Sequence, residues 1–316
     1  CASRSSHRLP WMWSSPWYSK PQTDQNQMPT MLACGHLQLT VKDMNLATVP
    51  RMWPFEPSNS PLPLPPQPLV FTQDELHWVQ AEQLEAKAMT CDELKSSVAT
   101  WKTDSGTTID AILEKEGAPL MADRRLILLL GELANPRRLA DIGAGPLPII
   151  NVRIDDICRT WTDTLDPRMM NPGVHHVTVA RTHGWWETTH LGFATMPQVR
   201  QLMEHLEDGS RGKWKPGKLA EGQLHVIHDA TLSPPSMDDL VWDGETERVE
   251  IERPSFDGPA LPIVEVFAPI HTRQGCYNHR GRLARCVHHL HRAFHNNIFR
   301  RGSARQWDDV VSVQKR

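Results

Sequence analysis

Apolar residues begin to recur at helical spacing shortly after residue 72. Thr72 with Glu75, and Thr90 with Glu93, have the spacing of a capping box. In such a box a threonine hydroxyl and a glutamate three residues later satisfy free backbone amides at the start of a helix. The apolar positions after each pair are spaced for one helical face: Leu76, Val79, Leu84, then Leu94, Val98, Trp101. This pattern predicts two or three short helices over residues 72–117.

Beyond residue 120 the spacing of apolar residues changes repeatedly. It predicts helices around residues 120–133, 150–165, 199–206 and 283–299. It predicts strands at residues 139–142, 174–180, 223–228, 261–267 and 309–313. Strands separated by helices are typical of a parallel sheet with helices on both faces, so we expect an α/β fold. Such sheets bind ligands at the carboxyl ends of their strands.

The N-terminal part of the chain has a different composition. Residues 1–68 contain twelve of the 26 prolines and four tryptophans, Trp11, Trp13, Trp17 and Trp53. Proline at this density favours an extended chain without internal hydrogen bonds. We therefore expect three regions: a Pro-rich tail and linker over residues 1–71, a helical lead-in over 72–118, and one α/β domain over 119–316. The tryptophans make the tail a candidate contact for a protein partner.

Charge is unevenly distributed along the chain. The formal net charge of −3 combines a net −11 over residues 1–270 with a net +8 over residues 271–316. The basic stretch contains seven arginines that we expect to contact RNA phosphates, because an arginine fork binds phosphate oxygens well. They are Arg280, Arg282, Arg285, Arg292, Arg300, Arg301 and Arg305. The alternatives are a solvated face or a docking surface for an acidic protein.

The sequence also limits where the protein works. No window approaches the roughly 18 apolar residues of a membrane span, which excludes a transmembrane role. Six scattered cysteines favour a reducing intracellular compartment, with the cytoplasm preferred and an organelle as the alternative. The chain opens on Cys1 instead of Met, which a cleaved targeting segment or a truncated clone would both explain.

The most specific segment for chemistry follows the predicted strand at 139–142. It contains Asp141, Ile142, Gly143, Ala144, Gly145 and Pro146. A strand that ends in a carboxylate and turns through two glycines into a helix lets the backbone approach a ligand closely. A structural turn without a ligand is the equally weighted alternative.

This segment resembles the first motif of S-adenosylmethionine-dependent methyltransferases. Later segments follow in the order of the FtsJ-like and viral cap ribose 2′-O-methyltransferases. The strand that ends at Asp229 is similar to their fourth-strand motif, residues 261–269 resemble the next strand, and residues 299–313 resemble the closing loop and strand. The resemblance covers residues 120–316. It implies a Rossmann-like sheet, S-adenosylmethionine bound by residues 141–146, and methyl transfer to an RNA ribose or an mRNA cap.

The resemblance also shows where this chain departs from the family. Those enzymes use a Lys-Asp-Lys-Glu tetrad in which a lysine of lowered pKa deprotonates the ribose hydroxyl. Asp229 matches the aspartate, and Glu265 stands where the central lysine is expected. The ribose-binding acid expected after the second strand is absent too, since that strand ends at Arg181 and His183. The alternative to an RNA methyltransferase is therefore a non-catalytic RNA- or protein-binding scaffold with a degenerate fold.

The C-terminal part of the chain also contains a candidate metal site. Cys276 with His279, and Cys286 with His289, offer four zinc-compatible ligands. Their spacing departs from that of familiar zinc fingers, and a solvated basic helix is the favoured interpretation. We therefore expect no metal, with zinc at these four residues as the minor alternative.

Overall fold

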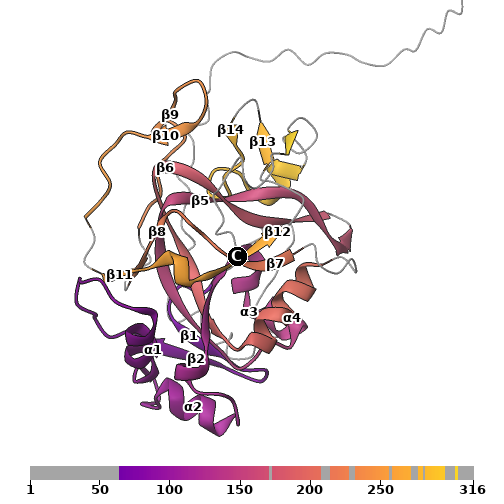
Figure 1. Cartoon of the computed structure of the whole chain (residues 1–316). Helices are drawn as coiled ribbons and strands as arrows, with labels where there is room; N and C mark the ends of the chain where they lie inside the picture. The colour runs from indigo at the N-terminus through magenta and orange to yellow at the C-terminus, as the bar shows by residue number, and fades with distance from the viewer. Residues whose placement is uncertain are drawn as a thin grey trace, which may run out of the picture. The chain divides into compact units, whose positions relative to one another are not determined.

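Two long antiparallel strands form the centre of the structure (Figure 1). They are β5 (Leu147–Met170) and β6 (Gly173–Ala194). The computed structural model describes residues 64–170, 173–207, 214–227, 232–255, 258–271, 277–279, 282–295 and 303–304. All statements below concern these residues.

Further strands extend the sheet on both sides of the β5–β6 hairpin. The main path runs β3-β2-β1-β5-β6-β4-β12-β7. Its other strands are β1 (Leu69–Phe71), β2 (Leu76–Gln80), β3 (Lys102–Thr103), β4 (Arg125–Leu129), β12 (Phe267–His271) and β7 (Trp214–Lys218). Off this path, β8 (Gln223–Val226) pairs with β5 and β11 (Ala260–Leu261), and β10 (Glu247–Val249) pairs with β6 and β9 (Leu240–Trp242). A second small sheet contains β14 (Arg282–Leu283), β13 (Tyr277–His279) and β15 (Ser303–Ala304).

The pairing corrects the expected sheet. The chain does combine helices and strands, but the neighbouring strands of the described sheets are antiparallel except for β12 with β4 and β10 with β6. The expected parallel sheet is therefore wrong. Helices still separate some successive strands, such as β2 from β3 and β6 from β7, but antiparallel neighbours do not need them as crossover connections.

Helices are few and short in the described chain. They are α1 (Cys91–Ala99), α2 (Ile109–Lys115), α3 (Pro136–Ile142), α4 (Met196–Leu206) and the single turn α5 (His291–Ala293). Three 3-10 turns, Met121–Asp123, Gly131–Ala134 and Ile263–Glu265, complete them. No helix of the described residues is long and apolar enough to cross a membrane.

Local capping signals predicted one helix start correctly and one wrongly. At α1 the Glu93 amide donates to the Thr90 hydroxyl at 3.2 Å, and the Thr90 amide donates to the Glu93 carboxylate at 2.7 Å. This confirms the capping box. Thr72 and Glu75 instead close the turn between β1 and β2, where the Thr72 hydroxyl donates to the Glu75 carbonyl at 3.0 Å. A threonine hydroxyl stabilises either turn, so the spacing does not distinguish them.

The helix predicted at residues 150–165 is strand β5. Ile150, Val152 and Ile154 share one face of the strand, and a β-bulge then shifts the alternation between Asp155 and Ile157. The extra residue, Asp156, has a left-handed φ of 63°. A period of two with one inserted residue produces steps of four and three, which is also the spacing of a helix.

Some of the other predicted elements are confirmed and some are wrong. Residues 174–180 and 199–206 lie in β6 and α4 as predicted, and residues 223–226 form β8. The predicted helix at 120–133 is wrong, because its apolar run forms β4, buried on both faces. The predicted strand at 139–142 is wrong as well, because Asn135 and Pro136 start helix α3 there. Residues 261–267 form only strand ends around a 3-10 turn, and the helix predicted from 283 is limited to α5 in the described chain.

The proline-rich segment is part of the fold from residue 64 onward. The Asn151 side chain donates to the Pro66 carbonyl at 3.0 Å, and His190 Nε2 contacts the Pro65 carbonyl at 2.8 Å. Leu69–Phe71, which the sequence analysis placed in the linker, is strand β1 between β2 and β5. The rest of the predicted tail lies outside the described residues.

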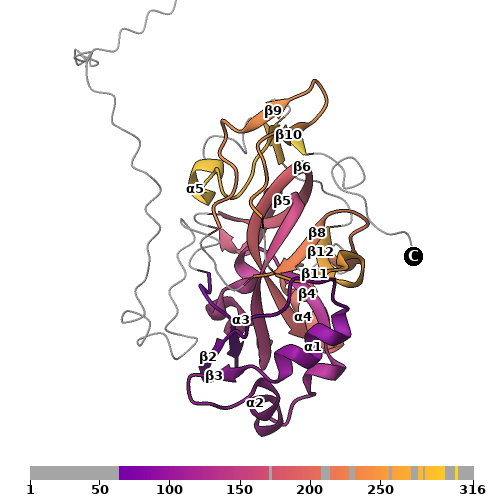
Figure 2. The same cartoon turned by 90° about the vertical axis from the view of Figure 1, so that its left-hand side faces the viewer.

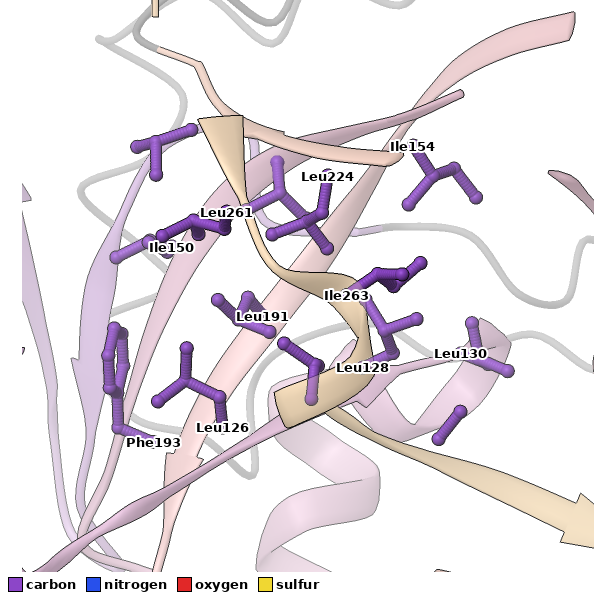
Figure 3. Packing of buried hydrophobic residues seen from close by; sticks show 14 of the residues in the cluster. Leu126, Leu128, Leu130, Ile150, Ile154, Leu191, Phe193, Leu224, Leu261 and Ile263 are labelled. Carbon is purple, nitrogen blue, oxygen red and sulfur yellow. The ribbon is translucent and has the colours of Figure 1, made fainter. Parts of the chain in front are cut away.

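A large apolar cluster holds these elements together (Figure 3). Leu126 and Leu128 from β4, Ile150 from β5 and Leu191 and Phe193 from β6 pack against one another. Apolar residues of α1, α2, β8 and the 3-10 turn at Ile263–Glu265 belong to the same cluster. The predicted helical lead-in and the predicted α/β domain therefore share one core.

Candidate functional site

The predicted cofactor turn lies at the end of a helix. Asp141 and Ile142 are in the last turn of α3, and Gly143 ends it with a left-handed φ of 71°. The Gly143 amide donates to the Ala140 carbonyl at 3.1 Å and the Ala144 amide to the Leu139 carbonyl at 3.1 Å. This is a Schellman-type helix end, for which glycine is the usual residue. The prediction of a strand that turns into a helix is wrong here.

Neighbouring parts of the same chain contact Asp141 and Gly145 and bury Ala144. A Cβ on Gly145 would lie 3.0 Å from the Phe71 ring and 3.2 Å from the Gln73 amide nitrogen. The Asp141 carboxylate is within 3.6 Å of Arg137 and 3.7 Å of Arg138. Ala144 is fully buried. Packing between the turn and the β1–β2 connection is therefore sufficient reason for glycine at 145.

Of the two predicted catalytic positions, only Glu265 belongs to the part of the chain that the structure describes. Asp229 lies outside the described residues. Glu265 is exposed in a 3-10 turn and is hydrogen-bonded to the Cys91 thiol at the start of α1. Burial, with the Glu265 hydrogen bond, raises the pKa of Cys91 to about 12, so this thiol is protonated at neutral pH.

One predicted RNA contact is an internal structural residue. The Arg285 side chain is 1% exposed, and its guanidinium donates to Glu247 Oε2 at 2.6 Å and to the Thr182 hydroxyl at 3.0 Å. It also lies 5.0 Å over the Trp185 ring. The prediction of phosphate contact is wrong for Arg285, because a buried and paired guanidinium is not available to a phosphate.

The other arginines of the basic stretch give a mixed result. Arg282 is half exposed and lies 3.6 Å from the same carboxylate, Glu247. Arg292 is exposed on α5. The remaining four, Arg280, Arg300, Arg301 and Arg305, lie outside the described residues, and their role stays a prediction.

The minor zinc alternative gains no support from the part of the chain that the structure describes. No group of three potential ligands there lies close enough to hold a metal ion. Burial raises the pKa of the Cys286 thiol well above its usual value. The backbone carbonyl of His289 accepts a hydrogen bond from the Trp161 indole at 2.8 Å. Cys276 and the His279 side chain lie outside the description.

A series of buried ion pairs along the β5–β6 hairpin was missed by the sequence analysis. Arg153 donates to Asp155 at 2.6 Å, and His225 lies 3.4 Å from the same carboxylate. Burial would raise the pKa of Asp155, but its hydrogen bonds to His225 and Arg153 outweigh this and lower it. Further along, Arg159 pairs with Glu187 at 3.1 Å. The signal was visible, since charged residues alternate with apolar ones from Val152 to Asp155.

A different kind of surface is formed by β9 and β10. Eight large apolar side chains are exposed in the described chain, and four of them lie within fifteen residues here. They are Met237, Val241, Trp242 and Ile251, exposed by 37% to 47%. β10 pairs with β6 at His183, in the middle of that strand, and the β9–β10 hairpin lies far from α1 and α2 (Figures 1 and 2). Sequence analysis passed over it because three-residue strands carry almost no periodicity.

Specific contacts hold this hairpin on the sheet. Leu240 and Val249 are paired across β9 and β10, and both belong to the apolar cluster that contains Trp185 and Trp186 of β6. Gly184 of β6 has a left-handed φ of 77°, and a Cβ there would lie 2.3 Å from the Val249 carbonyl oxygen. Glu247 is the third anchor, because its carboxylate accepts from Arg285 and from the Leu283 amide. The inner side of the hairpin is therefore fixed.

The outer edge of the hairpin has no partner strand among the described residues. Among the described strands, β9 pairs with β10 and with no other. Val241 stands opposite Arg248, and Trp242 opposite Glu247, so the two exposed side chains lie on opposite faces of β9. An edge strand with apolar side chains is a template for pairing with another chain.

No protein family model, no curated protein and no solved structure matches this chain.

Proposed function

We propose that this chain is a non-catalytic binding subunit that docks a protein partner on the β9–β10 hairpin. The observation that carries the proposal is that Met237, Val241, Trp242 and Ile251 are all exposed within residues 237–251, around a strand with no second partner among the described strands. Large exposed apolar side chains close together in one segment often mark interaction sites. The docking surface is defined here as residues 237–251.

The fixed inner side supports this function. Trp185, Gly184 and Glu247 hold the hairpin in one position on β6. A partner that pairs with a preformed strand does not have to order it, which favours binding. Arg285 supports a protein partner over RNA, because this arginine anchors the hairpin from inside.

Peptide display tests the proposal. Peptides are selected for binding to the immobilised full chain, and their binding to the V241K variant is then compared. A lysine at Val241 leaves the buried side of the hairpin unchanged but places a charge on the open edge, which opposes strand pairing. L290K is the matched control, since Leu290 is exposed on another segment. We expect the selected peptides to bind the wild type and L290K but not V241K. Equal binding to all three chains would refute the docking surface.

The methyltransferase function stays a prediction. Titration calorimetry of the full chain with S-adenosylmethionine and S-adenosylhomocysteine tests it directly. Micromolar binding that G143A or G145A weakens would favour the enzyme over the binding subunit. Gly106→Ala is the control, because Gly106 has a similar left-handed φ of 82° in another turn.

A further inference from the structure

We infer that the partner presents an extended, basic segment that adds to the sheet along β9. This inference rests on the proposed docking function and names the chemistry of the partner. Two independent features of the hairpin lead to it: the charge around the exposed apolar residues and the open edge of the strand.

Negative charge surrounds the docking surface. Six carboxylates of residues 232–255 are exposed or half exposed: Asp238, Asp239, Asp243, Glu245, Glu250 and Glu252. Glu247 is buried and paired with Arg285. Of the two cations in this range, Arg253 is paired with Asp155 and Asp156, which leaves Arg248 beside Glu250. Arg282, which is half exposed, lies 3.6 Å from Glu247. The six carboxylates outnumber these cations, so the surface seen by a partner carries a net negative charge.

Two of these carboxylates are kept ionised by the turns that they close. Asp239 accepts from the Ser236 hydroxyl at 2.7 Å and from the Ser236 amide at 2.8 Å. Asp243 accepts from the amides of Thr246 at 2.8 Å and Glu245 at 2.9 Å. These hydrogen bonds lower the pKa of both groups. The anionic character therefore belongs to the fold of the hairpin and persists below neutral pH.

The negative charge of the docking surface disfavours some classes of partner and favours others. Phosphates of RNA would be repelled by six carboxylates, and so would an acidic protein. Lysine and arginine side chains would be attracted, and a cation that reaches the exposed Trp242 ring gains a further favourable contact. A basic segment with apolar residues between its charges matches both the carboxylates and the apolar side chains.

The geometry of β9 explains why an extended segment is expected. The side chains of a strand point alternately to its two faces, and Val241 and Trp242 do so at the open edge. A strand paired along this edge would hydrogen-bond to the backbone and place side chains beside Val241 on one face and Trp242 on the other. Strand addition of this kind obtains affinity from the backbone and specificity from side-chain contacts.

Three blocked peptides of equal length test the inference by fluorescence anisotropy with the full chain. They alternate valine with lysine, with threonine or with glutamate. We expect the lysine peptide to bind at least about tenfold more tightly than the threonine peptide at low salt, because several ion pairs add to the same backbone pairing. This preference should shrink as the salt concentration rises. The glutamate peptide should bind most weakly.

Two charge-neutralised variants locate the effect. In E245Q/E250Q/E252Q the preference for lysine over threonine should fall to about threefold or less, while the threonine peptide binds as before. The matched control is E82Q/E114Q/E116Q, which removes three exposed carboxylates from elsewhere and should leave the preference unchanged.

The outcomes separate this inference from the proposed function. Equal affinity for the three peptides, lost in V241K, would overturn the basic partner and leave the docking surface intact. Binding that V241K does not alter would overturn both. Concentration-dependent self-association that is abolished in V241K, measured by analytical ultracentrifugation, would make a second copy of this chain the occupant and so overturn the inference.

Discussion

At the scale of single residues, the glycines show how sequence patterns for ligand binding and for packing coincide. Gly143 and Gly145 fit a cofactor turn by sequence, yet the structure uses them to end α3 and to admit Phe71. Gly184 carries no motif, but it permits a close approach of the β10 backbone at Val249. A single sequence does not distinguish a glycine required for packing from one required for ligand binding, because both positions need a residue without a side chain.

Replacing Gly184 by alanine tests this packing role. The added Cβ would lie 2.3 Å from the Val249 carbonyl oxygen and would also force alanine into a left-handed φ of 77°. We expect G184A to lower the free energy of unfolding by about 3 kcal/mol in urea titrations. The control is G106A, which has a φ of 82° with nothing within 4 Å and should cost about 1 kcal/mol. Equal losses in the two variants would show that the close approach to Val249 does not matter.

At the scale of elements, hydrogen bonds among histidines join α5 to the β5–β6 hairpin. His175 Nδ1 contacts the Thr162 carbonyl at 2.9 Å, so this nitrogen carries the proton. In the neutral ring, Nε2 then accepts from His295 Nδ1 at 2.9 Å. The His175 backbone amide donates to His291 Nε2 at 2.7 Å. The last of these bonds requires His291 Nε2 to be unprotonated, and burial disfavours a charged His175 ring.

Acid should therefore weaken the attachment of α5. Burial first, and then the nearby His291 and His295, lower the pKa of His175 to about 3 from the ordinary 6.5. Between pH 6.5 and pH 3 the unfolded chain binds a proton at His175 and the folded chain does not. The contribution of His175 to the free energy of unfolding is therefore complete above pH 6.5 and is lost as the pH falls toward 3. At pH 5 His175 alone should reduce the free energy of unfolding by about 2 kcal/mol relative to pH 7.

Urea titrations of wild type and H175Q at pH 5 and pH 7 measure this effect. H175Q should be less stable than wild type at pH 7 but should lose about 2 kcal/mol less on acidification. H183Q is the control, since His183 is 82% exposed and is not one of the histidines that join α5 to the β5–β6 hairpin. The prediction fails if H175Q and wild type lose the same amount.

The elements also show which parts of the fold a sequence can predict. The start of α1 follows from the Thr90 hydroxyl and Glu93, and α4 from apolar spacing, because these signals lie within a few residues. Strand β5 was misread because the bulge at Asp156 turns a period of two into helical steps. The exposed edge of β9 depends on which strands pair far apart along the chain, and no local pattern contains that information.

At the scale of the whole molecule, pairing between distant strands and a shared core change the expected division into domains. The sequence analysis separated residues 72–118 from the rest because two capping boxes suggested a helical lead-in. In the structure β2 and β3 continue the main sheet through β1, and Val98 of α1 shares the large apolar cluster with Leu191 of β6. A sheet and a core that cross the expected boundary should unfold together, because neither half keeps its apolar surface buried alone.

Two core variants on opposite sides of that boundary test this cooperativity. Val98 and Leu191 are both fully buried, so V98A should cost about 2 kcal/mol and L191A about 3 kcal/mol. We expect each to shift one common urea transition with an unchanged slope, observed identically by near-ultraviolet circular dichroism and by limited proteolysis within residues 72–118. E114Q, exposed on α2, is the control and should leave the midpoint in place. If V98A instead produces an earlier, separate transition for residues 72–118, these residues form their own unit, and the boundary drawn from the capping boxes is real although the strands cross it.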